Sequence, residues 1–191
     1  MSSFLRFAGA AALVLSFGLA ARALPLGIFG EVAIKALAGT DAICAALNHL
    51  IVDCDIVAKL TACVNVATLA ELQVAIAACV EPIKACADAL LNIDAGVGAA
   101  VDASVKADIV VCLVAFISLI VKVCLQLTLK FGVSVVATLL AELDLCVKLL
   151  LVNLNICIAG IMDLIVKACA SATVSLMAEV SLAACAKLLG N

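Results

Sequence analysis

The chain lacks tryptophan and tyrosine, and its six phenylalanines make aromatic residues only 3% of 191 residues. So few aromatic side chains disfavour a stacking platform for bases or sugars. Arginine occurs only at Arg6 and Arg22. Bidentate phosphate clamps require arginine, and nucleic-acid binding requires a positively charged face. We therefore expect no nucleic-acid partner.

Motifs for catalysis and cofactor binding are missing as well. The chain has no Gly-x-Ser-x-Gly nucleophile elbow, and Gly96 and Gly98 precede no Lys-Ser or Lys-Thr pair of a phosphate loop. Asn-x-Ser/Thr glycosylation sites are absent too. We predict that the protein is not an enzyme, and that it has no catalytic, cofactor-binding or metal site.

The single histidine, His49, lies between Asn48 and Leu50 in a helical context. We interpret it as a surface or hydrogen-bonded histidine and not as a general base. Asp53 and Asp55 flank Cys54, but neighbours two apart in a helix point to different faces. They are therefore not expected to form a pair of catalytic carboxylates.

Hydrophobic residues are abundant, at 68% of the chain, against about half in an ordinary globular protein. Such a chain has ample material to bury, which excludes disorder. Residues 1–23 account for part of the excess. Arg6 precedes a short apolar run, and Ala21-Arg22-Ala23 supplies small residues for cleavage, so we predict a secretory signal peptide over 1–23.

The remaining residues, 24–191, are predicted to form a single helical domain. They hold nine lysines and fourteen acids, a formal charge of −5. Residues 24–108 carry ten acids and four lysines, and residues 109–191 carry four acids and five lysines. The first part of the domain, residues 24–108, is therefore more acidic, and the second part, residues 109–191, is more apolar. The later helices either occupy the centre of the fold or form a hydrophobic end.

Charged residues indicate helices in five places, because five lysines have an acid four positions earlier. This order stabilises a helix surface. The pairs are Glu31/Lys35, Asp55/Lys59, Asp102/Lys106, Asp144/Lys148 and Asp163/Lys167. We interpret them as solvated polar stripes. No long segment alternates with period two, so the predicted fold is all-α, a disulfide-stapled bundle of about five to six helices.

Glycine, proline and capping residues suggest the helix boundaries. Thr68-Leu69-Ala70-Glu71 fits a capping box, and Pro82 should kink the helix that follows or end it near Glu81. Residues 92–100 are the clearest loop, and Gly132 and Gly190 should end helices. The expected helices cover 30–38, from 40 or 41 to 63, 68–91, 101–130, 134–160 and 173–189.

The apolar second half also raises the alternative of a multi-helix membrane protein. Residues 109–121 contain only one polar side chain, Ser118. Charged residues follow at intervals, however, and each costs about 2.5–3.5 kcal/mol at the centre of a bilayer. Membrane insertion is therefore the less favoured alternative.

Eleven cysteines are scattered along the chain, with no Cys-x-x-Cys motif. In an oxidising compartment their default state is the disulfide, joining different helices. An odd number leaves at least one free thiol or one bond between molecules, and the sequence does not identify that residue. The candidates are Cys44, Cys54, Cys63, Cys79, Cys86, Cys112, Cys124, Cys146, Cys157, Cys169 and Cys185.

In its signal segment ending Ala21-Arg22-Ala23, its length, its scattered cysteines and its apolar second half, the chain resembles small secreted wall and matrix proteins of mushroom-forming fungi. The similarity is to the hydrophobic type linked to aerial hyphae and attachment. Hydrophobins are excluded, because their Cys-Cys doublets are missing. The resemblance implies a structural role at surfaces and transfers no functional residues.

Three functions follow as hypotheses. The first is a secreted, non-enzymatic, surface-active protein of the cell wall or extracellular matrix, whose partners are hydrophobic surfaces or other copies of itself. The second is an extracellular carrier of lipid-like ligands, because an aliphatic bundle could hold a cavity. The third is the membrane protein described above.

Overall fold

The computed structural model describes residues 34–93, 97–98, 100–169 and 171–190. Every regular element in these ranges is helical, which confirms the predicted all-α class. The residues described from position 34 onwards belong to one compact unit. The predicted signal peptide, 1–23, lies outside the described residues, as does the start of the predicted helix over 30–38.

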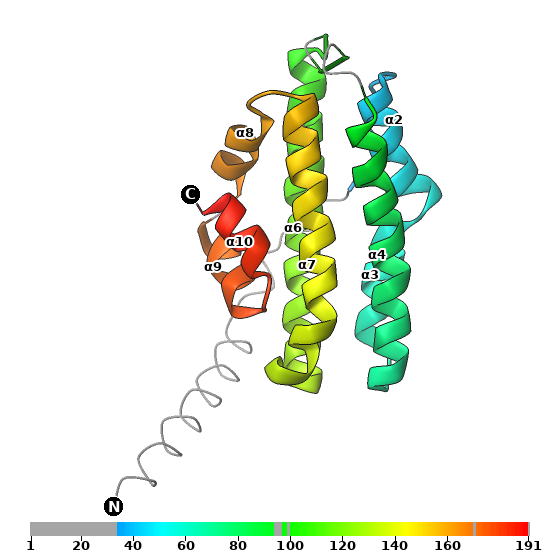
Figure 1. Cartoon of the computed structure of the whole chain (residues 1–191), viewed down its shortest axis with the longest axis vertical. Coiled ribbons are helices and arrows are strands. Elements are labelled where there is room, and N and C mark those ends of the chain that lie inside the picture. Colours follow the sequence, from blue (N-terminus) through cyan, green and yellow to red (C-terminus); the bar gives the residue numbers. More distant parts are fainter. Residues whose placement is uncertain (1–33, 94–96, 99, 170, 191) are drawn as a thin grey trace, which may run out of the picture. The chain divides into compact units, whose positions relative to one another are not determined.

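Four helical arms form the main bundle (Figure 1). The first arm is interrupted and consists of α2 (Ala42–Asn48), the π-helical turn η2 (His49–Asp53) and α3 (Ile56–Asn65). The other arms are α4 (Leu69–Leu91), α6 (Ala103–Phe131) and α7 (Val133–Cys157). Around the bundle, α3 contacts α4 and α6, and α7 contacts the same two helices. The arms α4 and α7 lie side by side and run in the same direction (Figure 1).

Three short helices lie against α6 and α7: α8 (Ile161–Ala168), α9 (Ser171–Glu179) and α10 (Ala183–Leu189). The prediction of five to six helices is therefore wrong, because the described residues contain more breaks than the sequence pattern suggested. Asp55 and Ser181 adopt positive φ values of 46° and 66° and interrupt what was expected to be continuous helix. Neither residue is a glycine, so neither break was predicted.

Several predicted boundaries are confirmed by capping contacts. Asp41 Oδ1 accepts hydrogen bonds from the N–H groups of Ile43 and Cys44 at the start of α2. Thr68 and Glu71 form the predicted capping box of α4. Hydrogen bonds from the N–H groups of Ala67 and Thr68 also lower the pKa of the Glu71 carboxyl. These contacts satisfy N–H groups that a helix leaves free at its N-terminus.

Gly132 separates α6 from α7, as predicted, and its φ of 90° is one that other residues rarely adopt. Helix α10 ends at Gly190, also as predicted, where the glycine N–H bonds the carbonyl of Ala186. Pro82, in contrast, neither ends nor divides α4, which is assigned as one helix of 23 residues. Contacts between α4 and α7 continue beyond this proline, because Asn153 and Cys157 of α7 donate hydrogen bonds to the carbonyl groups of Ala87 and Leu90.

Residues 34–40 are not helical, so the described part of the predicted helix over 30–38 is wrong. Asn48 holds this extended segment against α2. Its Oδ1 accepts from the N–H of Leu37 at 2.7 Å, and its Nδ2 donates to the carbonyl of the same residue at 2.9 Å. Two hydrogen bonds from a later side chain therefore satisfy backbone groups that a helix would have paired internally.

The carboxylate of Asp144 lies inside the protein, with 5% of the residue exposed. Its two oxygens accept hydrogen bonds from the N–H groups of Ala184 and Cys185, at 2.7 and 2.9 Å, in the first turn of α10. The interpretation of Asp144/Lys148 as a solvated surface pair is therefore wrong. Asp144 is the N-terminal cap of another helix, 40 residues later in the chain.

The other acid and lysine pairs in the described range lie at or within helices, but none forms an ion pair within 4 Å. Asp55 and Asp102 are the N-cap residues of α3 and α6, and Asp163 lies in the first turn of α8. The spacing thus indicated helices correctly. Glu31 lies outside the described residues.

Candidate functional site

An unbroken aliphatic stripe lies on the surface of the C-terminal half of α7. Leu145, Leu149 and Ile156 are 54%, 42% and 59% exposed, and Val152 between them is partly exposed. Their spacing of four, three and four residues places all four side chains on one side of the helix. The stripe, defined as these four residues, extends about 16 Å along the helix axis.

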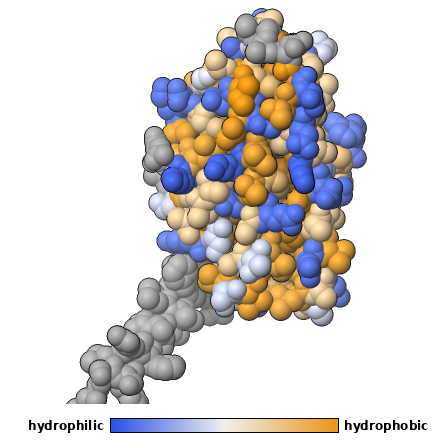
Figure 2. Space-filling view, in the orientation of Figure 1, coloured by the Kyte–Doolittle hydropathy of each residue, from blue (hydrophilic) through white to orange (hydrophobic). Residues whose placement is uncertain are grey.

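The N-terminal half of α7 carries a different surface. Ser134, Thr138 and Glu142 are exposed there on nearly the same side of the helix. Figure 2 shows the hydrophobic surface running over the upper part of α7 between more polar neighbours. The hydrophobic surplus of residues 109–191 is therefore only partly buried, because α6 forms core along much of its length while α7 presents aliphatic side chains to the outside.

Further large aliphatic side chains are exposed outside the stripe, on other helices and at the start of α7. They are Val52 in η2, Leu69, Val74 and Leu91 in α4, Val111 and Leu129 in α6, Val133 and Val135 at the start of α7, and Leu164 in α8. Isolated exposed aliphatic residues are normal on protein surfaces. The regular stripe on α7 differs from them because its members adjoin one another.

The structure gives less support to the hypothesis of a lipid carrier than to that of a surface-active protein. The hollow between α6, α7 and the C-terminal helices is lined by Ile117, Ile120, Val147, Met177, Leu182 and Cys185 and admits no water-sized sphere. A ligand there would have to separate helices that are already packed. This hollow is thus not a preformed binding cavity.

The described residues include one helix, α6, that is long and apolar enough to cross a membrane by itself. A second candidate would require α8 and part of α9 to act as one span bent by 91°. In the most apolar 18-residue stretch of α6, 61% is buried inside the protein. The core helix of a soluble bundle has the same length and hydrophobicity, so α6 does not distinguish between the two classes.

All eleven cysteines carry free thiols in the structure. The predicted disulfides are therefore not observed, and cysteine pairing stays a prediction. Cys63 in α3 and Cys79 in α4 come close, with 3.7 Å between their sulfur atoms. Other buried thiols donate hydrogen bonds to the carbonyl groups of neighbouring helices. These contacts link Cys86 to Ala46, Cys157 to Leu90 and Cys185 to Asp144.

Ten of the cysteines are buried, and Cys54 alone is partly exposed. Burial raises the pKa of Cys44, Cys86 and Cys146 to about 12, and that of Cys112 to about 11. The hydrogen bond with Cys63, together with burial, raises the pKa of Cys79 still further. Thiols with such values are protonated and unreactive at neutral pH.

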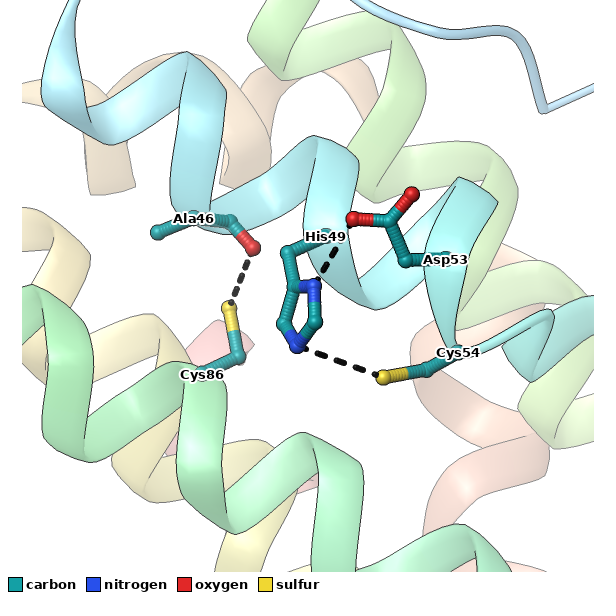
Figure 3. Close-up of polar contacts among 5 residues, drawn as sticks. All are labelled: Ala46, His49, Asp53, Cys54 and Cys86. Atoms are coloured by element: carbon teal, nitrogen blue, oxygen red, sulfur yellow. Dashed lines mark hydrogen bonds and ion pairs between the residues drawn. The ribbon is translucent and has the colours of Figure 1, made fainter.

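Cys54 lies in a different environment, beside the only histidine (Figure 3). The Nε2 atom of His49 is 3.7 Å from the Cys54 sulfur, and its Nδ1 atom is 2.8 Å from Oδ2 of Asp53. The Asp53 carboxylate accepts a hydrogen bond from Nδ1–H of His49. This bond favours the tautomer in which Nε2 carries no hydrogen and has a free lone pair. The three side chains form a surface Cys-His-Asp cluster, in which Nε2 can accept the thiol proton.

The π-helical turn brings these residues together. In an α-helix of 3.6 residues per turn, a residue five positions later lies about 140° around the axis. In η2 the N–H of Cys54 instead donates to the carbonyl of His49, five residues earlier, at 2.9 Å. One turn of the wider helix therefore separates the two residues, and both Asp53 and Cys54 can flank the imidazole.

The sequence did not predict this cluster, because a single α-helix was expected from residue 40 or 41 to residue 63. The interpretation of His49 as a surface histidine is compatible with its 65% exposed side chain, but its two partners were not foreseen. The available signal was the crowding of a histidine, two aspartates and a cysteine into residues 49–55. Asp55, in the left-handed conformation, ends the turn directly after Cys54.

In the described part of the chain, no group of three or more histidine, cysteine, aspartate or glutamate residues has the geometry to hold a metal ion, and the absence of a metal site stays a prediction. No protein-family model, curated protein or solved structure matches this chain.

Proposed function

We propose that this chain is a secreted structural protein of a cell wall or extracellular matrix that acts at hydrophobic surfaces. The observation that carries the proposal is the aliphatic stripe of Leu145, Leu149, Val152 and Ile156 on α7. A contiguous exposed apolar patch marks a contact surface for another apolar phase or partner. A rigid helix holds the stripe in place, so adsorption does not require the bundle to unfold.

The rest of the surface supports the same function. The acids lie predominantly in the first half of the chain, and α7 itself changes from polar to aliphatic along its exposed side. A folded protein with wettable and apolar regions lowers its free energy at an air–water or solid–water boundary. Burial of the stripe contributes roughly 25 cal/mol for each Å² that leaves water.

Disulfide staples would suit a protein that persists outside the cell. The sulfur atoms of Cys63 and Cys79 are 3.7 Å apart, and a disulfide needs about 2.05 Å. A small rotation of both side chains would bring the sulfur atoms to bonding distance. A two-electron oxidant, such as oxygen or another disulfide, would then remove both thiol hydrogens and join α3 to α4. Closing a loop of this length contributes about 3 kcal/mol to stability.

The test is adsorption by the folded protein. The chain should lower the surface tension of water in a pendant drop and coat a hydrophobic solid. Replacement of Leu145, Leu149 and Ile156 by Gln removes the stripe while keeping good helix formers, so both effects should fall several-fold. Circular dichroism should show an unchanged helix content.

The control replaces three exposed but separate residues, Val74, Val111 and Leu129, by Gln; their exposed fractions of 71%, 58% and 50% are at least comparable to those of the stripe. This variant should adsorb nearly as well as the parent. Equal losses in the two variants would mean that general hydrophobicity, and not the stripe, drives adsorption. A parent protein without surface activity would overturn the proposed function.

A further inference from the structure

The cysteines divide into ten that are buried and one, Cys54, that reaches the surface. If the cysteines pair within the chain, their odd number leaves at least one without an intramolecular partner. Accessibility identifies the residue that can react with molecules in solution. In addition, Cys54 is the cysteine whose sulfur lies next to the imidazole of His49.

We infer that Cys54 is a thiol–disulfide exchange nucleophile, activated by His49 and Asp53, whose substrate is a low-molecular-weight disulfide such as oxidised glutathione. Three features of the cluster carry this inference. The imidazole Nε2 atom lies 3.7 Å from the sulfur, Asp53 holds the opposite ring nitrogen at 2.8 Å, and the side chains of His49 and Asp53 are 65% and 66% exposed.

The reaction needs nothing beyond these groups and the disulfide. His49 Nε2 accepts the proton of Cys54, and the thiolate attacks one sulfur of the substrate RS–SR. A bond forms between Cys54 and that sulfur while the S–S bond of the substrate breaks. The departing RS⁻ takes the proton from the imidazolium, so one disulfide and one thiol become a mixed disulfide and one free RSH.

The surroundings of the cluster favour this substrate class. Attack on a carbonyl group would require donors that stabilise an oxyanion, whereas attack on a disulfide requires a thiolate and access along the S–S axis. Cys54 is only partly exposed, and its sulfur faces the Nε2 atom of His49 (Figure 3). A small disulfide reaches this sulfur more easily than one that is fixed in a protein surface.

Asp53 acts through His49 and is a positioning residue. Its hydrogen bond orients the ring and stabilises the imidazolium that forms during proton transfer. Asp55, two residues later, is the N-cap residue of α3 and makes no side-chain capping bond. It provides a nearby carboxylate against which the effect of Asp53 can be compared.

The experiment measures the reaction of the folded, reduced chain with oxidised glutathione and with the chromogenic disulfide DTNB at pH 7. One thiol per chain should react rapidly, and peptide mapping should place the mixed disulfide on Cys54. Cys54→Ser should remove the rapid phase. Cys169→Ser, which changes a buried cysteine, should retain it.

His49→Gln tests the activation and preserves the thiol. It should slow the rapid phase by about tenfold or more without changing its amplitude. Asp53→Asn should slow it less, and Asp55→Asn should leave it unchanged. The difference in rate between the parent and His49→Gln should narrow as the pH rises, because hydroxide can then take the thiol proton in place of the imidazole. A merely structural role of His49 predicts no such narrowing.

Two results would overturn the inference. One is rapid modification at a cysteine other than Cys54 in the folded chain. The other is an equal rate for the parent and His49→Gln at pH 7. Surface activity is measured separately and does not depend on Cys54. Failure of the exchange reaction would therefore not contradict the proposed adsorption function, and failure of adsorption would not contradict the exchange reaction.

Discussion

At the scale of single residues, Asp144 is the clearest case of a charge with a structural task. Its carboxylate is buried and receives two backbone hydrogen bonds from α10. Hydrogen bonds to a charged group contribute about 1.5–3 kcal/mol each, and a donor left buried without a partner costs about 1–3 kcal/mol. The Asp144 side chain therefore makes two of the hydrogen bonds that attach α10 to α7.

Asp144→Ala should lower the free energy of unfolding by about 2–4 kcal/mol, because the N–H groups of Ala184 and Cys185 lose their acceptor. Chemical denaturation measures this loss, and hydrogen exchange should show the two amides opening first. Asp163→Ala, at an exposed position in α8, should change stability by less than about 0.5 kcal/mol. Equal effects of both variants would contradict the assigned role.

Lys130 is another single side chain that joins two helices distant in the sequence, α6 and α3. It lies in the last turn of α6, and its Nζ donates hydrogen bonds to the carbonyl groups of Val64 and Val66 at the end of α3. These carbonyls lack partners inside their own helix. This contact joins segments more than 60 residues apart, so local sequence patterns could not reveal which helix end Lys130 meets.

At the scale of elements, α4 shows that tertiary packing can override a local breaker. Pro82 lies inside this helix, and the proline nitrogen cannot donate to the carbonyl of Ala78. The helix nevertheless continues to Leu91 and packs along α7. The predicted end near Glu81 is therefore wrong, because it rested on local preference alone, whereas contacts with α7 hold the helix beyond Pro82.

Pro82→Ala should raise the free energy of unfolding by about 1–2 kcal/mol. Alanine restores the helical hydrogen bond, which outweighs the roughly 0.4–1 kcal/mol that proline gains by restricting the unfolded chain. Thermal and chemical denaturation measure the change. Lys84→Ala, at an exposed position in the same helix, is the control and should shift stability by less than about 0.5 kcal/mol. Destabilisation by Pro82→Ala would show that the proline fits the local geometry better than alanine.

At the scale of the whole molecule, the buried thiols link folding to pH. In the unfolded chain a cysteine titrates near pH 9.0, whereas burial raises the pKa of Cys44, Cys86 and Cys146 to about 12 in the folded chain. The unfolded chain therefore releases these protons first as the pH rises. Their contribution to stability is complete below about pH 9 and is lost between about pH 9 and pH 12.

The reduced protein should consequently be less stable at pH 10 than at pH 7, by on the order of 1 kcal/mol for each such thiol. Guanidinium unfolding in the presence of a reductant measures the difference. Protein whose cysteines are paired as disulfides has no thiol protons to lose and should show a much smaller pH effect. Equal stability of the reduced chain at the two pH values would contradict the burial of these thiols.

The sequence by itself determined the helical class, several caps and the hydrophobic surplus, because these depend on local spacing. Acid and lysine pairs four apart, Thr68 with Glu71, and Gly132 act within one or two helical turns. Tertiary structure decided what depends on contact between distant segments: the burial of Asp144 beneath α10, the continuity of α4 past Pro82, and the exposure of the α7 stripe. The π turn at His49 belongs with these, since no local pattern distinguished it from α-helix.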